Sequence, residues 1–273
     1  MKKKLTGLIG CILLLAISLT GCGGQEAKTP AGDENKLVVG ATAIPHAGIL
    51  EVVKPLLAEE NITLEIKEFT DYSLLNPALN DKQIDANFFQ HVPFLNDYNA
   101  KNDTDLVWTV KVHNEPMGIY SENVTNVEDV KEGASIGIPN DATNGGRALM
   151  VLEAANLIKL KENAGVTATD RDISENPKKI KIVMMDAAML PRSLEDLDLC
   201  VINSNYAIEG GLNPVTDSIF MEPKDSPFAN ILAVRSENKN NELIQKLGES
   251  LQSPEVKKYL EENYPGACVP AFE

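Results

Sequence analysis

The sequence is poor in positive charge and in aromatic side chains. Its 273 residues hold 25 Lys and Arg against 40 Asp and Glu, which gives a formal net charge of −15 at pH 7. An acidic surface of this kind repels nucleic acid and anionic lipid, so neither is expected as a partner. Phe, Tyr and Trp make up only 5% of the residues, and a local cluster of them is therefore informative.

Long apolar runs are confined to the N-terminus. Three lysines precede an apolar run at residues 5–19, which is shorter than the roughly 20 residues of a membrane-spanning helix. The run ends in Leu-Thr-Gly-Cys, residues 19–22, which resembles the lipobox of bacterial lipoproteins, with Cys22 as the acylated first residue of the mature chain. We expect a lipoprotein signal peptide at 1–21, with an ordinary signal peptide as the alternative. Residues 22–36 contain almost no large apolar side chain and are expected to form the lipidated N-terminus and a flexible tether.

Cysteine is scarce, with four in the chain. Cys11 would leave with the signal peptide and Cys22 would carry the lipid, so Cys200 and Cys268 stay in the folded part. Cys200 lies in an apolar strand pattern, so the simplest interpretation is that its thiol is buried in the core. Export would permit a disulfide between Cys200 and Cys268, and the sequence leaves that question open.

Known catalytic sequence patterns are missing. The sequence has no Gly-x-Ser-x-Gly, His-Glu-x-x-His or Cys-x-x-Cys pattern and no Gly-Lys-Ser/Thr phosphate loop. Three histidines, His46, His91 and His113, could meet around a metal ion, but none has the local spacing of a metal-ligand motif. We therefore expect no catalytic residue, no metal site and no cofactor. A lipid-anchored hydrolase and a metal-receptor lipoprotein are kept as alternatives.

Strand and helix patterns alternate from residue 37 onward, which favours the α/β class, with parallel or mixed sheets covered by helices. Strands are expected at 37–41, 62–66, 106–112, 117–120, 136–138, 179–184, 199–202 and 228–234. Helices are expected at 45–57, from 76 toward 84, from the turn before Arg147 through 160, at 194–197, and at 241–264 with a break at Ser253-Pro254. Pro55 is expected to bend or shorten the first helix.

Residues 136–149 combine an apolar strand, a polar turn with two glycines, and a helix start that includes Arg147. Loose backbone amides at a helix start and a guanidinium together suit the capture of a carboxylate or phosphate. An arginine near a helix N-terminus is electrostatically unfavourable unless an anion lies beside it. We therefore expect an anion near Arg147, with a solvated arginine as the alternative.

Three phenylalanines and a histidine fall within residues 85–95, interleaved with Asn and Gln. Such a mixture suits a pocket for an amphiphilic ligand, while packing in the core is the alternative for each ring. Two asparagines lie next to expected strands, Asn205 after 199–202 and Asn230 at the start of a late one. Open α/β sheets place ligand contacts at the carboxyl ends of strands, although asparagine is also common in turns.

These segments closely resemble the NlpA-type methionine-binding lipoproteins, the solute receptors of methionine ABC importers. The resemblance covers essentially the whole chain after the tether and is carried by residues 85–95, 138–149, 190–194, 201–207 and 226–230. It implies a type II periplasmic-binding-protein fold, in which two α/β lobes hold the ligand in the cleft between them. Lobe one would comprise 37–115 plus 224–273, and lobe two 116–223.

The resemblance also assigns roles to individual residues. Arg147 would clamp the α-carboxylate of an amino acid, helped by turn amides near Asn144 and Gly145. Asn205 and Asn230 would orient the ammonium and carboxylate groups. The thioether would be enclosed by the side chains of Tyr72, Phe88, Phe89 and His91. Phe94 and Phe228 stand where the family often has tyrosine, so a hydroxyl contact is lost there.

The function implied is that of a lipid-anchored extracytoplasmic receptor that binds methionine and delivers it to the permease and ATPase complex of an ABC importer. Ligand would favour a closed form, because contacts from both lobes exist together only there. The lipid on Cys22 would hold the receptor at the membrane. Receptors of the same fold for a methionine-containing dipeptide or another small amino acid are the alternatives.

Overall fold

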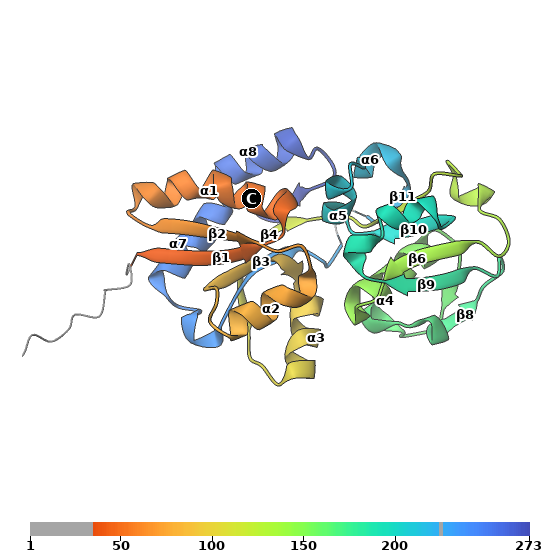
Figure 1. The fold of residues 1–273 in the computed structure, drawn as a ribbon, viewed down its shortest axis with the longest axis horizontal. Helices are drawn as coiled ribbons and strands as arrows, with labels where there is room; N and C mark the ends of the chain where they lie inside the picture. Colours follow the sequence, from red (N-terminus) through yellow and green to blue (C-terminus); the bar gives the residue numbers. More distant parts are fainter. Residues whose placement is uncertain (1–34, 224–225) are drawn as a thin grey trace, which may run out of the picture. The chain divides into compact units, whose positions relative to one another are not determined.

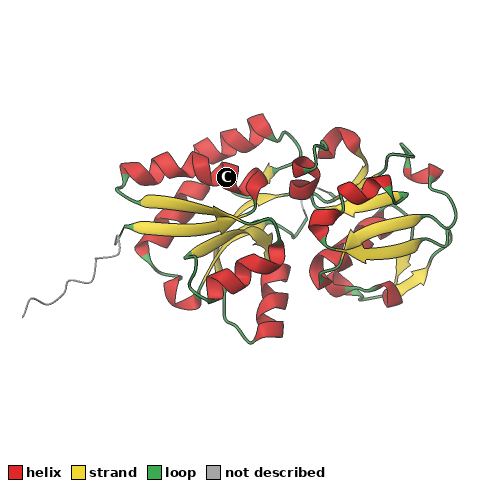
Figure 2. Ribbon diagram, in the orientation of Figure 1, coloured by secondary structure: helices red, strands yellow, loops and turns green. Residues whose placement is uncertain are grey.

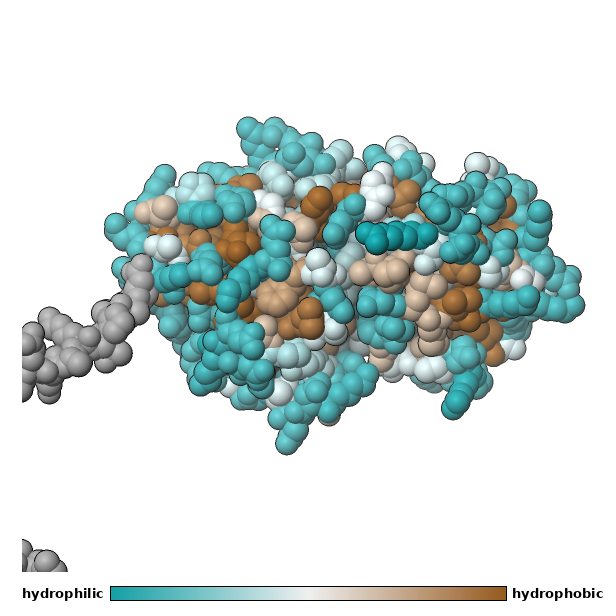
Figure 3. All heavy atoms as spheres, viewed as in Figure 1, coloured by the Kyte–Doolittle hydropathy of each residue, from teal (hydrophilic) through white to brown (hydrophobic). Residues whose placement is uncertain are grey.

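The computed structural model describes residues 35–223 and 226–273. The expected signal peptide, the lipobox with Cys22 and the tether up to residue 34 lie outside the described residues. Residues 35–273 form one compact unit that contains two large sheets (Figures 1 and 2). Hydrophilic side chains cover most of the face shown in Figure 3, as the acidic composition leads one to expect.

The first sheet has six strands in the order β13-β4-β12-β3-β1-β2. Strand β1 pairs in parallel with β2 and β3, whereas β12 runs antiparallel to β3 and β4, and β13 antiparallel to β4. The strands span Lys36–Ala41 (β1), Thr63–Glu68 (β2), Ala86–His91 (β3), Val107–Asn114 (β4), Asn230–Val234 (β12) and Val269–Pro270 (β13).

Helices cover both faces of this sheet (Figure 1). Alternate residues of β1, including Val39 and Ala41, point into an apolar core shared with α1, α7 and α8. Val38 faces the other way and packs on the core under α2 and α3. The helices span Gly48–Glu59 (α1), Tyr72–Asn80 (α2), Val92–Asn102 (α3), Glu242–Leu251 (α7) and Pro254–Asn263 (α8).

The second sheet has five strands in the order β11-β5-β10-β6-β9. Its parallel strands β6, β9 and β10 pack with α4 around an apolar core that includes Ile136, Ile138 and Leu149. The elements span Gly118–Tyr120 (β5), Ser135–Pro139 (β6), Ala142–Ala154 (α4), Lys181–Met185 (β9), Leu199–Ile202 (β10), Ser204–Glu209 (α5), Pro214–Asp217 (α6) and Ser218–Met221 (β11). The chain enters this sheet between β4 and β5 and leaves it between β11 and β12. The division into two moving lobes, 37–115 plus 224–273 and 116–223, stays a prediction.

The expected α/β class is confirmed, and most expected elements occur, with corrected ends. The second helix begins at Tyr72 rather than Asn76, because the Asp71 side chain caps it by accepting a hydrogen bond from Ser73 N. The helix expected through residue 160 ends at Ala154. There Asn156 adopts the left-handed conformation (φ 57°) and the chain turns into a short hairpin of Lys159–Leu160 (β7) and Ile173–Glu175 (β8).

The remaining helix and strand predictions differ by smaller amounts. Helix α1 begins at Gly48 and continues past Pro55 to Glu59, so this proline does not end it. The expected break at Ser253-Pro254 is confirmed, since the Ser253 hydroxyl caps α8. Where the sequence predicts a helix at 194–197, the structure has a short 3₁₀ turn that spans Arg192–Glu195.

Both cysteines of the folded part are free and buried. Cys200 and Cys268 therefore do not form the disulfide that the sequence left open. Burial raises the pKa of the Cys200 thiol to about 12 and that of Cys268 well above its usual value. Neither sulfur is expected to react while the protein is folded. No helix in residues 35–223 and 226–273 could span a bilayer.

Candidate functional site

A buried polar pocket lies between elements of the two sheets. The first sheet and its helices contribute side chains from α2, β3, α3 and β12, and the second contributes side chains from α4 and from the start of α5. The space left between them is about 20 Å³, room for about one water molecule. The pocket is lined by Tyr72, Phe89, Gln90, His91, Phe94, Glu115, Asn144, Arg147, Asn203, Ser204 and Asn230.

The structure brings most of the predicted site residues together here. The predicted residues that line the pocket are Tyr72, Phe89, His91, Asn144, Arg147 and Asn230. Phe88 does not line it, because its ring packs against His46 and His113, at centroid distances of 4.8 and 5.5 Å. Gly145 and Asn205 do not line it either, but Asn205 contacts a residue that does.

The helix start at α4 differs from the expectation of loose amides. Asp141 caps this helix, and its carboxylate accepts a hydrogen bond from Asn144 N at 2.9 Å. Gly145 N donates to the Asp141 carbonyl at 2.8 Å. The amides near Asn144 and Gly145 are therefore already bonded within the helix cap, and the expectation that they are loose is wrong. The side-chain oxygen of Asn144 accepts hydrogen bonds from two other lining residues, His91 and Asn203.

Arg147 lies in the second turn of α4 and is held by protein groups. Its Nε donates to both carboxylate oxygens of Glu222 at 3.2 Å, and its Nη2 donates to Glu222 and, at 2.8 Å, to the Glu115 carbonyl. The ring of Phe228 lies 4.3 Å from the guanidinium carbon. The carboxylate of Glu222 thus lies beside Arg147, and the captured ligand carboxylate or phosphate expected there stays a prediction. Within the described part of the chain, Nη1 makes no hydrogen bond.

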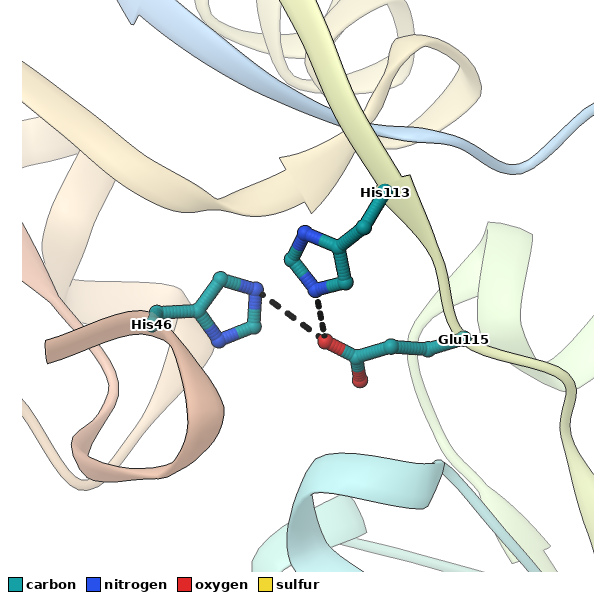
Figure 4. A group of neighbouring side chains, drawn as sticks. All are labelled: His46, His113 and Glu115. Carbon is teal, nitrogen blue, oxygen red and sulfur yellow. Dashed lines mark hydrogen bonds and ion pairs between the residues drawn. The ribbon is translucent and has the colours of Figure 1, made fainter. Parts of the chain in front are cut away.

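The Glu115 carboxylate lies between two histidines, His46 and His113 (Figure 4). Its Oε1 lies 2.6 Å from His113 Nε2 and 3.3 Å from His46 Nε2, and all three side chains are buried. Burial raises the pKa of Glu115, but His46, His113 and Arg147 outweigh burial and lower it below its usual value. Burial lowers the pKa of His46 to about 4. At neutral pH, His46 is therefore neutral.

His46, His113 and Glu115 are close enough to share a metal ion, but their hydrogen bonds do not fit one. A metal on His113 Nε2 would put the proton on Nδ1, which is buried without a partner. His46 Nδ1 lies 2.8 Å from the Thr42 hydroxyl, and its Nε2 lies 3.2 Å from Asn230 Oδ1. These contacts fit a neutral ring that donates from Nε2. His91, the third histidine of the metal alternative, lies outside this group.

Hydrogen bonds cross the pocket from one sheet's elements to the other's. His91 Nε2 donates to Asn144 Oδ1 at 3.2 Å, and its Nδ1 accepts from Phe94 N. Burial lowers the pKa of His91 to about 3, so this ring is also neutral at pH 7. The Tyr72 hydroxyl donates to Asn205 Oδ1. Asn205 Nδ2 is buried without a partner.

Two further groups complete the walls. Tyr72, Phe89 and Phe94 form an aromatic cluster with centroid distances of 5.6 to 6.1 Å. Beneath it, the amides of Asn76, Asn87 and Gln90 bond to one another at 2.7 to 2.9 Å. The amide cluster therefore fixes Gln90 in the pocket wall.

Sequence reasoning missed several pocket residues. Asn203 directly follows the strand at 199–202. The tendency of α/β sheets to place ligand contacts at the carboxyl ends of strands, which points to Asn205, points to Asn203 as well. Glu115 carries no local motif, and neither does Glu222, which does not line the pocket but pairs with Arg147. Glu222 is 75 residues from Arg147, so only the folded chain shows the pair.

Comparisons with known proteins show what this chain is similar to. A family model described as NlpA lipoprotein matches residues 37–272. The chain is 42% identical over 252 residues to a Vibrio cholerae protein named probable D-methionine-binding lipoprotein MetQ, with 92% of each chain covered. A structure of an ABC transporter periplasmic substrate-binding protein from Coxiella burnetii is similar at 41% identity and a TM-score of 0.83, over 86% of this chain and 100% of that one. A nutrient binding protein from Burkholderia cenocepacia bound to methionine is similar at 39% identity and a TM-score of 0.84, with the same coverage.

Proposed function

Because the chain belongs to the NlpA lipoprotein family, we propose that it is a lipid-anchored extracytoplasmic receptor that binds methionine and delivers it to an ABC importer. The names of the relatives support this role: one is called a probable D-methionine-binding lipoprotein and another a periplasmic substrate-binding protein of an ABC transporter. The fold is the type II periplasmic-binding-protein fold that the resemblance implied. The protein acts as a receptor and not as an enzyme.

The single observation that carries the proposal is the free Nη1 edge of Arg147 in a buried pocket with an aromatic wall. The methionine carboxylate would accept hydrogen bonds from Nη1, which is the one edge of the guanidinium that Glu222 and the Glu115 carbonyl leave open. Asn230 in the pocket wall, and Asn205 through its unpartnered Nδ2, would orient the polar groups of the ligand.

The thioether would lie against Tyr72, Phe89, Phe94 and His91. Each sulfur–aromatic contact contributes about 0.3–1.5 kcal/mol, and burial of the side chain adds about 0.8 kcal/mol per methylene. Phe88, whose ring packs on the other side of β3, is not part of the proposed site.

Ligand entry needs the pocket to open, because about 20 Å³ cannot hold an amino acid. The proposed hinge is the connection between the sheets at 115–117, together with the described ends of the second connection, at 222–223 and 226–229. Methionine would enter when the two lobes part and would favour the form in which both contact it. The permease and ATPase complex would then recognise that form, while the lipid on Cys22 keeps the receptor at the membrane.

Calorimetry with methionine on the wild type and on Arg147→Ala tests the proposal. We expect binding by the wild type and a loss of at least roughly a hundredfold in the variant, because removal of a charged partner from a buried carboxylate contact is costly. Arg192→Ala, at an exposed arginine, is the matched control. Unchanged affinity in Arg147→Ala would refute the carboxylate clamp. Mass spectrometry of ligand retained by gently purified protein distinguishes methionine from a dipeptide or another amino acid.

A further inference from the structure

One apolar core is shared by the two halves of the described chain, which are the first sheet with its helices and the second sheet with its helices. The cores around α1 and around α4 each contain residues of one half. Another core joins Tyr72 and Phe89 of the first half to Tyr206 of the second. Separation of the halves exposes part of this apolar surface to water, which is unfavourable. This core therefore favours the arrangement in which the halves touch.

Tyr206 of α5 contacts the first half in two ways. Its ring lies 4.7 Å from the ring of Tyr72, measured between centroids. Its hydroxyl donates to the carbonyl of Thr70, two residues before α2, at 3.2 Å. The side chain of Tyr206 is 3% exposed. Burial raises the pKa of its hydroxyl, so the group stays protonated and remains a donor.

Both contacts of Tyr206 are made behind the pocket wall. Tyr72 lines the pocket, and Tyr206 does not. Tyr206 lines a separate surface groove of about 460 Å³, together with Thr70 and other residues of both halves. The hydrogen bond from Tyr206 to Thr70 therefore joins the two halves at this groove. A ligand in the pocket would not touch Tyr206 and would not need to break its bond.

A contact of this kind affects the rate of exchange more than the affinity. Entry and release of methionine both need the halves to separate, because the pocket is too small to admit it otherwise. A bond that the closed protein makes with and without ligand lowers the open fraction of the free protein and of the complex by the same factor. The association and dissociation rates then fall by that factor, and the dissociation constant, which is their ratio, does not change.

On the basis of the proposed function, we infer that Tyr206 is a latch: its hydrogen bond to Thr70 slows the entry and the release of methionine equally and leaves the affinity unchanged. The hydrogen bond from His91 to Asn144 acts differently, because both residues line the pocket and a ligand there competes with the bond. The latch keeps a loaded receptor closed for longer, so the ligand stays bound until the receptor meets the importer.

The test measures two quantities for methionine. The dissociation rate comes from the loss of radiolabelled methionine after a chase with unlabelled methionine, and the dissociation constant comes from calorimetry. Tyr206→Phe keeps the ring and removes the hydroxyl. Release should become roughly threefold to tenfold faster, which corresponds to one hydrogen bond, while the dissociation constant stays within about twofold of the wild type. The control Tyr98→Phe removes the hydroxyl of a half-buried tyrosine in α3 and should keep the wild-type release rate.

Three results would overturn the latch. The first is a wild-type release rate in Tyr206→Phe. The second is faster release with an affinity weakened by the same factor, because Tyr206 would then stabilise the complex alone. The third is tighter binding without faster release, because the bond would then be absent from the complex.

Two further points make the experiment decisive. If Tyr206→Phe does not fold, judged by circular dichroism, Tyr206→Met takes its place, since it keeps an apolar side chain and removes the same hydroxyl, with the same expected result. A wild type that binds no methionine overturns the latch together with the proposed function. If the wild type binds methionine, failure of the latch in the variant leaves the proposed function standing.

Discussion

The phenol hydroxyl of Tyr72 donates a hydrogen bond to the side-chain oxygen of Asn205, 133 residues away in the sequence. Tyr72 begins α2 beside the first sheet, and Asn205 lies in α5 beside the second. Both side chains are buried. The contact therefore ties the two halves of the described chain together next to the pocket.

Tyr72→Phe should lower the free energy of unfolding by about 1–3 kcal/mol, because it leaves Asn205 Oδ1 buried without a donor. The ring stays, so the aromatic packing with Phe89 and Phe94 is kept. Urea unfolding followed by circular dichroism measures the change. Tyr98→Phe, at a half-buried tyrosine whose hydroxyl makes no hydrogen bond in the described residues, is the control and should change stability by less than about 0.5 kcal/mol. Equal stability of Tyr72→Phe and the wild type would contradict the importance of this bond.

Stability should fall as the pH drops below neutrality. The pKa values of His46 and His91 are lowered from 6.5 to about 4 and about 3 by burial. Below pH 6.5 the unfolded chain therefore takes up protons that the folded protein does not. The stabilisation that comes from keeping His46 and His91 neutral is complete above pH 6.5 and is lost as the pH falls toward 4. The free energy of unfolding should fall on the order of 1 kcal/mol per pH unit for each histidine.

Urea unfolding of the wild type and of His91→Gln, between about pH 7.5 and pH 5, measures this slope. The variant should lose stability less steeply, whatever its stability at neutral pH, because one of the two titrating groups is gone. Glu132→Gln, which removes an exposed carboxylate, should keep the wild-type slope. Equal slopes in His91→Gln and the wild type would show that His91 is not kept neutral by the fold.

The thiols of Cys200 and Cys268 should be unreactive in the folded protein. Both are buried, and burial raises the pKa of each, so little thiolate forms near pH 8. A chromogenic disulfide reagent should detect two more thiols in urea than in buffer. Cys200→Ala should reduce that difference to one. Rapid reaction of the folded wild type at either position would contradict the buried placement.

The sequence predicts the elements of this fold better than their ends. Strands 37–41 and 199–202 are recognisable because their side chains are apolar almost throughout. The start of α2 is missed because the cap of Asp71 is a single side-chain contact. The end of α4 is missed because its apolar spacing continues past the left-handed turn at Asn156.

The site is predictable where a local segment carries the signal, as Arg147, His91 and Asn230 do. Phe88 is expected in the pocket because it lies in the same aromatic segment, but the alternation of β3 side chains points it away from Phe89 and into the core shared with His46 and His113. No sequence pattern identifies Glu222, because only the folded chain brings it next to its partner Arg147. The charge of Glu115 is equally hidden, because its pKa depends on burial and on two histidines from separate elements.

The small space inside the pocket also bears on how tightly ligand is held. If methionine can enter only while the pocket is open, the measured dissociation constant equals the intrinsic one divided by the fraction of open molecules. Each bond that closes the empty pocket, such as that between His91 and Asn144, lowers this fraction. Apparent affinity is then set partly by residues that need not contact the ligand, and a variant that loosens the empty form can bind more tightly than the wild type.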